Sequence, residues 1–126
     1  MKRTIKVGIA QISSRLGFIE YNEKKIIEAL ERGKNSGADI VVFPELTTMG
    51  YGSGDIYLDK VDENLESLKR ILKKTEELKI WAIIGFVDKD ERGFFYNSAA
   101  LIDSGRIMGK YAKTQLVNYR LFDELK

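Results

Sequence analysis

Hydrophobic residues along the chain fall first into short continuous runs and then into helical spacing. Two such runs, 7–12 and 38–43, flank a segment whose apolar residues recur every three or four positions. The runs are typical of strands buried on both faces, and the spacing between them predicts an amphipathic helix. Asn22 is the expected N-cap of that helix, and Gly37 its C-terminal stop. The first third of the chain therefore predicts a parallel βαβ unit.

The rest of the chain predicts a second helix and then an antiparallel meander. A loop with three glycines is expected over 47–60, and an amphipathic helix over 61–78. Polar turns separate three further strands, expected at 79–87, 94–102 and 106–112. Residues 113–126 show no clear period. The sequence thus predicts an α/β fold, with about five strands in a mixed sheet and two long helices.

Composition limits the chemistry that the chain can perform. Its 126 residues carry 21 Lys and Arg against 19 Asp and Glu, a balance that does not favour nucleic acid or anionic membranes as partners. Cysteine and histidine are both absent, which excludes disulfides, thiolate sites and a cysteine nucleophile within this sequence. We expect no metal and no cofactor. Lys6 interrupts the N-terminal apolar run, and no run reaches the roughly 18 residues of a membrane span, so a cytoplasmic location is expected.

Glu45 is the first candidate for chemistry. It follows the strand 38–43 and Pro44, and ligands of open α/β sheets bind at the carboxyl ends of strands. Its apolar neighbours predict partial desolvation, which would raise the pKa of the carboxyl group and make it a better base. The alternative is a solvated loop glutamate, which its position alone favours.

Lys113 is the second candidate. Lys110 and Lys113 are three residues apart, so a regular strand would direct them to opposite faces. A lysine beside an acid could stabilise an oxyanion, whereas an edge-strand lysine that discourages aggregation is the common alternative. The glycine loop, Gly50-x-Gly-x-Gly54, lacks the dinucleotide-binding pattern, so nucleotide binding there is not expected.

Four stretches together resemble the carbon–nitrogen hydrolase (nitrilase) superfamily. They are 7–11 (VGIAQ), 38–46 (ADIVVFPEL), 95–99 (FYNSA) and 109–116 (GKYAKTQL). Gly50, Tyr51 and Asp55, together with the segment 118–124 (NYRLFDE), are most similar to the branch formed by the glutaminase domains of glutamine-dependent NAD synthetases.

The resemblance implies an αββα sandwich and a Glu–Lys–Cys triad that hydrolyses amides, glutamine in this branch. Glu45 then matches the base and Lys113 the lysine that stabilises the oxyanion. Glu124 matches a supporting glutamate, and Tyr119 lies in the segment that shapes the glutamine pocket. We expect Glu45 and Lys113 to approach one another in the fold.

The chain departs from the family pattern in one decisive respect. The family's nucleophilic cysteine follows the lysine by several dozen residues, and its domain is about twice this length. Residues 1–126 are thus expected to form one partial domain, an N-terminal half that is inactive alone. Two functions stay open: a hydrolase fragment completed by a cysteine-bearing remainder, or a non-catalytic assembly or ligand-binding protein. The antiparallel second half disfavours a third, a flavodoxin-like binding module.

A half-sandwich would leave one face of its sheet without a partner. Because the strands 7–12 and 40–43 are apolar on both faces, exposing one of them to water is unfavourable. We therefore expect a homodimer that packs sheet on sheet, or a complementing C-terminal half. A monomer that folds its meander over the exposed face is the alternative.

Overall fold

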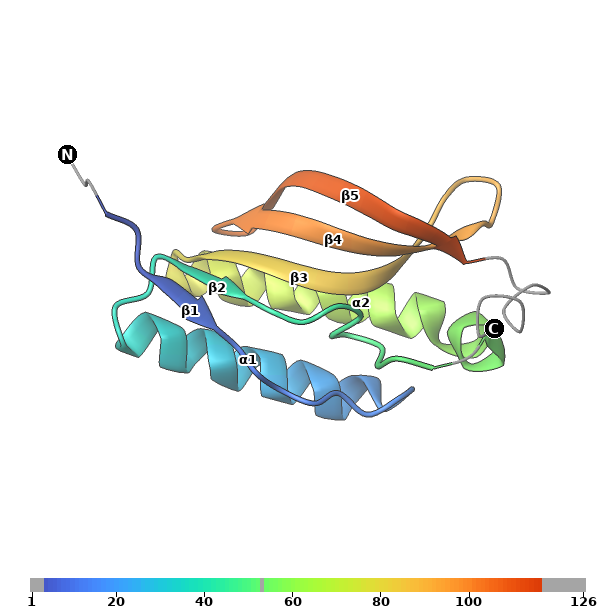
Figure 1. Ribbon diagram of the computed structural model, residues 1–126, viewed down its shortest axis with the longest axis horizontal. Helices are drawn as coiled ribbons and strands as arrows, with labels where there is room; N and C mark the ends of the chain where they lie inside the picture. Colours follow the sequence, from blue (N-terminus) through green and yellow to red (C-terminus); the bar gives the residue numbers. More distant parts are fainter. Residues whose placement is uncertain (1–3, 53, 117–126) are drawn as a thin grey trace.

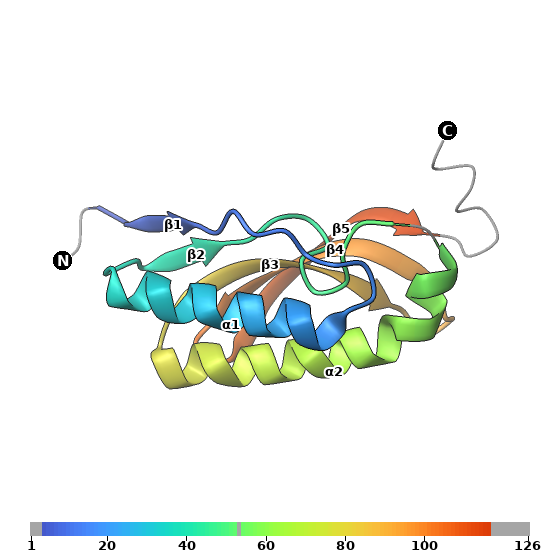
Figure 2. The same cartoon turned by 90° about the horizontal axis from the view of Figure 1, so that it is seen from below.

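A single five-stranded sheet carries both long helices on one of its faces (Figures 1 and 2). The computed structural model describes residues 4–52 and 54–116. In chain order the elements are β1 (Val7–Ile9), α1 (Ile19–Asn35), β2 (Ile40–Val42), α2 (Gly54–Leu78), β3 (Trp81–Lys89), β4 (Phe95–Asp103) and β5 (Arg106–Leu116). The spatial order of the strands is also β1-β2-β3-β4-β5, with parallel pairing up to β3 and antiparallel pairing after it. The predicted mixed α/β architecture is confirmed.

Several element boundaries differ from the sequence prediction: β1 ends at Ile9 rather than at residue 12, and β2 covers only residues 40–42 of the expected 38–43. Helix α2 begins at Gly54 rather than at residue 61, because the hydroxyl of the buried Tyr57 accepts a hydrogen bond from Gly52 N at 2.8 Å and Tyr57 joins the core. Strand β5 continues to Leu116, so the segment without clear period begins inside a strand. Pairing with β4 sustains it there, where the sequence alone carries no strand signal.

Asn22 is not the N-cap of the first helix, and that prediction was wrong. Helix α1 begins at Ile19, and Phe18 at its N-cap makes no side-chain capping bond. Asn22 lies within the helix and is fully buried, where its side chain binds two loops. A capping residue and a buried loop anchor have the same short amide side chain, so sequence does not distinguish them.

The main core lies between the helices and the sheet. Its fully buried members include Ile26 and Leu30 of α1, Ile71 of α2 and Ile84 of β3. Among residues 4–52 and 54–116, neither helix has the length and apolar character needed to cross a membrane.

The opposite face of the sheet carries two apolar rows in cross-strand register, which we call the open face. One row joins Val7, Ile40 and Trp81, and the other joins Ile9, Val42, Ile83 and Leu101. Ile9 is 66% exposed and Trp81 37% exposed. Strands β4 and β5 extend the same sheet and do not fold over this face (Figure 1). Within the described residues this face of the sheet has no cover. The predicted burial of both faces is therefore not seen in β1, where Val7 and Ile9 are exposed.

Candidate active site

The turn that carries Glu45 leaves the sheet at the carboxyl end of β2. Phe43 N still donates to Ile83 O at 2.9 Å, after which Pro44 and Glu45 begin the turn. Leu46 has a left-handed φ of 53°, and its carbonyl accepts a hydrogen bond from Gly50 N at 2.7 Å. These backbone bonds place the Glu45 side chain beyond the last paired residue of β2, as the sequence predicted.

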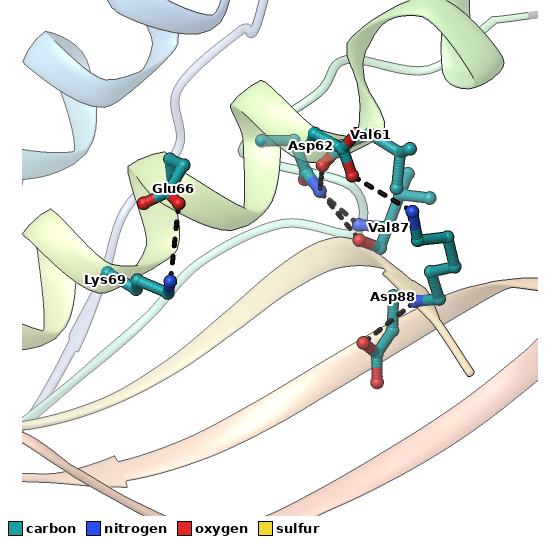
Figure 3. Close-up of polar contacts among 8 residues, drawn as sticks. Val61, Asp62, Glu66, Lys69, Val87 and Asp88 are labelled. Atoms are coloured by element: carbon teal, nitrogen blue, oxygen red, sulfur yellow. Dashed lines mark hydrogen bonds and ion pairs between the residues drawn. The ribbon is translucent and has the colours of Figure 1, made fainter. Parts of the chain in front are cut away.

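Two buried asparagines, one from each helix, hold this turn through Thr48. The Asn22 amide of α1 donates to Thr48 O at 3.0 Å and to Arg15 O at 2.9 Å. The Asn64 amide of α2 donates to Val87 O at 2.7 Å, and its Oδ1 accepts bonds from Val87 N and from the Thr48 hydroxyl. Figure 3 shows the contacts between this part of α2 and Val87 on β3. The loop beside the site is thereby fixed to both helices and to the sheet.

Lys113 reaches the site from an irregularity in β5. The register passes from Ser98↔Ala112 to Asn97↔Thr114, so Lys113 is the extra residue of a bulge. Its side chain hydrogen-bonds and ion-pairs with Glu45. Lys110, in contrast, pairs with Asp88 Oδ2 at 3.0 Å. The two lysines therefore form ion pairs with different residues, Lys110 with Asp88 and Lys113 with Glu45. They lie on opposite faces of the strand, as their spacing predicted.

The Glu45 carboxylate is bound at both oxygens. Lys113 Nζ contacts Oε2, and Asn97 Nδ2 of β4 donates to Oε1 at 2.8 Å. The expected approach of Glu45 and Lys113, 68 residues apart in sequence, is confirmed. A pocket opens beside the pair, and its other lining residues include Pro44, Gly85, Ala99 and Tyr111.

The electrostatics of Glu45 differ from the sequence expectation. The hydrogen bond from Lys113, followed by that from Asn97, lowers the pKa of Glu45 below its ordinary value, and partial burial opposes them without prevailing. The predicted rise of this pKa by desolvation was wrong, because the Glu45 side chain is 38% exposed and has two donors. The same hydrogen bond and the charge of Glu45 raise the pKa of Lys113. At neutral pH the pair is thus a carboxylate that can accept a proton and an ammonium that can donate hydrogen bonds.

Sequence reasoning assigned Asn97 to a strand and gave it no role. The available signal was a polar residue inside a predicted strand, since a buried amide without a partner is costly. Tyr119 and Glu124, the two other predicted site residues, lie outside the described residues. Within residues 4–52 and 54–116, acidic side chains form no cluster of three that could hold a metal ion.

Comparison with known proteins shows which family the chain belongs to. The family model for carbon–nitrogen hydrolases matches residues 6–125. The chain belongs to the carbon–nitrogen hydrolase family. The resemblance noted in the four sequence stretches is therefore confirmed at the level of the family.

The relatives of this carbon–nitrogen hydrolase chain include much longer proteins. The glutamine-dependent NAD(+) synthetase of Thermotoga maritima is 41% identical over 126 residues, which cover 98% of this chain and 21% of that protein. The enzyme of the same name from Acinetobacter baylyi is 33% identical, over 97% of this chain and 22% of its own length. The chain spans about a fifth of these relatives.

Solved structures confirm the nitrilase-like fold. Glutamine-dependent NAD+ synthetase from Acinetobacter baumannii, in complex with ADP, superposes with a TM-score of 0.80 at 35% identity, over 98% of this chain and 23% of that one. An amidase variant of the nitrilase superfamily from Nesterenkonia gives a TM-score of 0.79 at 22% identity, over 88% of this chain and 43% of that one. At that identity the second match concerns the fold alone.

Proposed function

We propose that this chain supplies the base and the oxyanion-stabilising cation of a glutaminase-type carbon–nitrogen hydrolase whose ammonia is used for NAD synthesis. The observation that carries the proposal is the contact of the Glu45 carboxylate with Lys113, because both residues line a pocket at the end of β2. The relatives that cover nearly the whole chain, and that are named glutamine-dependent NAD(+) synthetases, support glutamine as the amide and NAD synthesis as the use of the ammonia.

The proposed reaction follows from the charges of the pair. Each oxygen of the Glu45 carboxylate keeps a second lone pair, which can take the proton of an attacking thiol. The sulfur–carbon bond then forms, and the amide oxygen becomes an oxyanion that the Lys113 ammonium stabilises. Collapse breaks the carbon–nitrogen bond, Glu45 returns the proton to the departing ammonia, and water hydrolyses the thioester.

The thiol must come from outside this sequence, which contains no cysteine. A correctly placed base cannot replace a missing nucleophile, because residues that act as a unit lose most of their effect together. We therefore expect no ammonia from glutamine or simple amides when the chain is assayed alone. Release above background that disappears in Glu45→Gln would contradict this expectation.

A chimera tests the proposal. Residues 1–126 of this chain would replace the aligned segment of the Thermotoga maritima relative, and ammonia release from glutamine would be measured. We expect the chimera to be active and its Glu45→Gln variant to be inactive, while Glu77→Gln, an exposed glutamate far in sequence from the site, keeps activity. A folded but inactive chimera would overturn the proposal in favour of the non-catalytic assembly or ligand-binding function.

The cytoplasmic location stays a prediction.

A further inference from the structure

Glu45 has a second partner, Asn97, that differs in kind from Lys113. Asn97 is 7% exposed, and its Nδ2 donates to Glu45 Oε1 at 2.8 Å. The Lys113 side chain is 57% exposed and joins the pair from a bulge in β5. Of the two partners, Asn97 is thus the short and buried one, with fewer rotatable bonds to fix.

We infer that Asn97 is a positioning residue, which fixes the orientation of the Glu45 carboxylate through its Nδ2–Oε1 hydrogen bond. The inference rests on the proposed function of Glu45 as a base. With one donor on each oxygen, rotation of the carboxylate about its last torsion would break at least one hydrogen bond. The remaining lone pairs of Glu45, a residue that lines the pocket, therefore keep a fixed direction.

The surroundings of Asn97 make it a rigid support. It lies in β4 between β3 and β5, opposite Val87 in the register of β3. The backbone N–H and the backbone C=O of Val87 both hydrogen-bond to the side chain of the buried Asn64. Sites held by packed strands and secondary hydrogen bonds keep their geometry better than sites held by exposed side chains.

The chemistry of the amide suits this role better than that of a carboxylate of the same shape. An amide N–H donates to an anion without adding charge. An aspartate at position 97 would place a second negative charge at hydrogen-bond distance from Oε1, and like charges raise the pKa of a carboxyl group. Asn97→Asp is therefore a nearly isosteric variant that reverses the interaction, whereas Asn97→Ala only removes it.

The test uses the full chain and needs no turnover. The Glu45 carboxyl carbon, labelled with ¹³C, would be titrated by NMR in the wild type, Asn97→Ala, Asn97→Asp and the control Asn35→Ala, an exposed asparagine. We expect the pKa of Glu45 to rise in Asn97→Ala, to rise further in Asn97→Asp, and to stay unchanged in Asn35→Ala. A loss of fold stability alone would lower the melting temperature without moving this pKa. An unchanged Glu45 titration in folded Asn97→Ala would overturn the inference.

A second measurement covers variants that fail to fold. In the wild type, the side-chain amide resonances of Asn97 should shift with the same midpoint as the Glu45 carboxyl, and Glu45→Gln should abolish that shift. Asn97 resonances that ignore the Glu45 titration would also overturn the inference. Either negative result leaves the chimera test of Glu45 itself unaffected, so the two proposals can fail separately.

Discussion

Gly85 of β3 lies against the backbone of Leu46, so closely that a Cβ at position 85 would sit 2.5 Å from Leu46 N. The same atom would be 2.7 Å from Pro44 O. Thr48 N also donates to Gly85 O at 3.2 Å. The turn that carries Glu45 therefore rests on a strand position where no side chain fits, and this contact sets how far Glu45 stands above the sheet.

Gly85→Ala is expected to displace that turn. Because the added methyl group meets backbone rather than a flexible side chain, we expect a loss of about 1–3 kcal/mol in the free energy of unfolding. Urea unfolding measures it, and the NMR titration of Glu45 reports whether its contacts survive. Gly109→Ala is the control, since a Cβ there meets nothing within 4 Å. Equal stability of the two variants would argue against the contact.

Asn64→Ala should destabilise the chain more than a surface change. It removes the hydrogen bonds to the backbone N–H and C=O of Val87 and the acceptor of the Thr48 hydroxyl, all in a fully buried position. Groups left unpaired there make the expected loss about 3 kcal/mol in the free energy of unfolding. Thr48→Val, which removes one hydroxyl, should cost less, and Asn35→Ala almost nothing. The prediction fails if thermal or urea unfolding ranks Asn64→Ala with Asn35→Ala.

The Glu45–Lys113 pair should make stability depend on pH in acid. Since the pKa of Glu45 is lower in the folded chain than its ordinary value of 4.5, its stabilising contribution is complete at neutral pH. That contribution is lost as the pH falls below 4.5 and through the lowered pKa. The wild type and Glu45→Gln should therefore differ in stability at neutral pH and converge in acid. A difference that stays constant across this range would show that the pair is not coupled to folding.

The open face leads us to propose a homodimer. Its two apolar rows run across neighbouring strands, and strands β4 and β5 do not cover them. A second copy offers the same rows and can pack on them about a two-fold axis. Light scattering at micromolar concentration should give a dimer for the wild type and a monomer for Ile9→Lys with Trp81→Lys. A well-folded wild-type monomer that binds no apolar dye would contradict the proposal.

The sequence predicted those features that follow from local patterns. Periodicity and turn residues predicted the order and type of the seven elements in the described part of the chain, and the strand ending before Pro44 predicted Glu45 at the end of that strand. A regular two-residue repeat predicted opposite directions for Lys110 and Lys113, although the bulge at Lys113 interrupts that repeat. The partners of the two lysines do not follow from a local pattern. Lys113 can pair with Glu45 only because β3 and β4 lie between β2 and β5 in the sheet.

The features of the site that the sequence did not predict depend on contacts between distant segments. Asn22 and Asn97 are polar residues whose partners lie 26 and 52 residues away in sequence. The direction of the Glu45 pKa likewise reflects two donors from other strands rather than its apolar neighbours. The sequence around Glu45 contains the carboxylate that accepts these hydrogen bonds but not the two residues that donate them. It therefore predicted burial as the dominant influence on the pKa.

The most direct test of the account compares two lysines in the glutamine-hydrolysing chimera. Lys113→Met removes the cation beside Glu45, and Lys110→Met removes a lysine of the same strand that pairs with Asp88 instead. Loss of one oxyanion donor typically lowers kcat by about 10²–10³-fold. We predict such a loss of ammonia release for Lys113→Met and near wild-type release for Lys110→Met. Equal activity of the two variants would contradict the assignment of Glu45 and Lys113 as the catalytic pair.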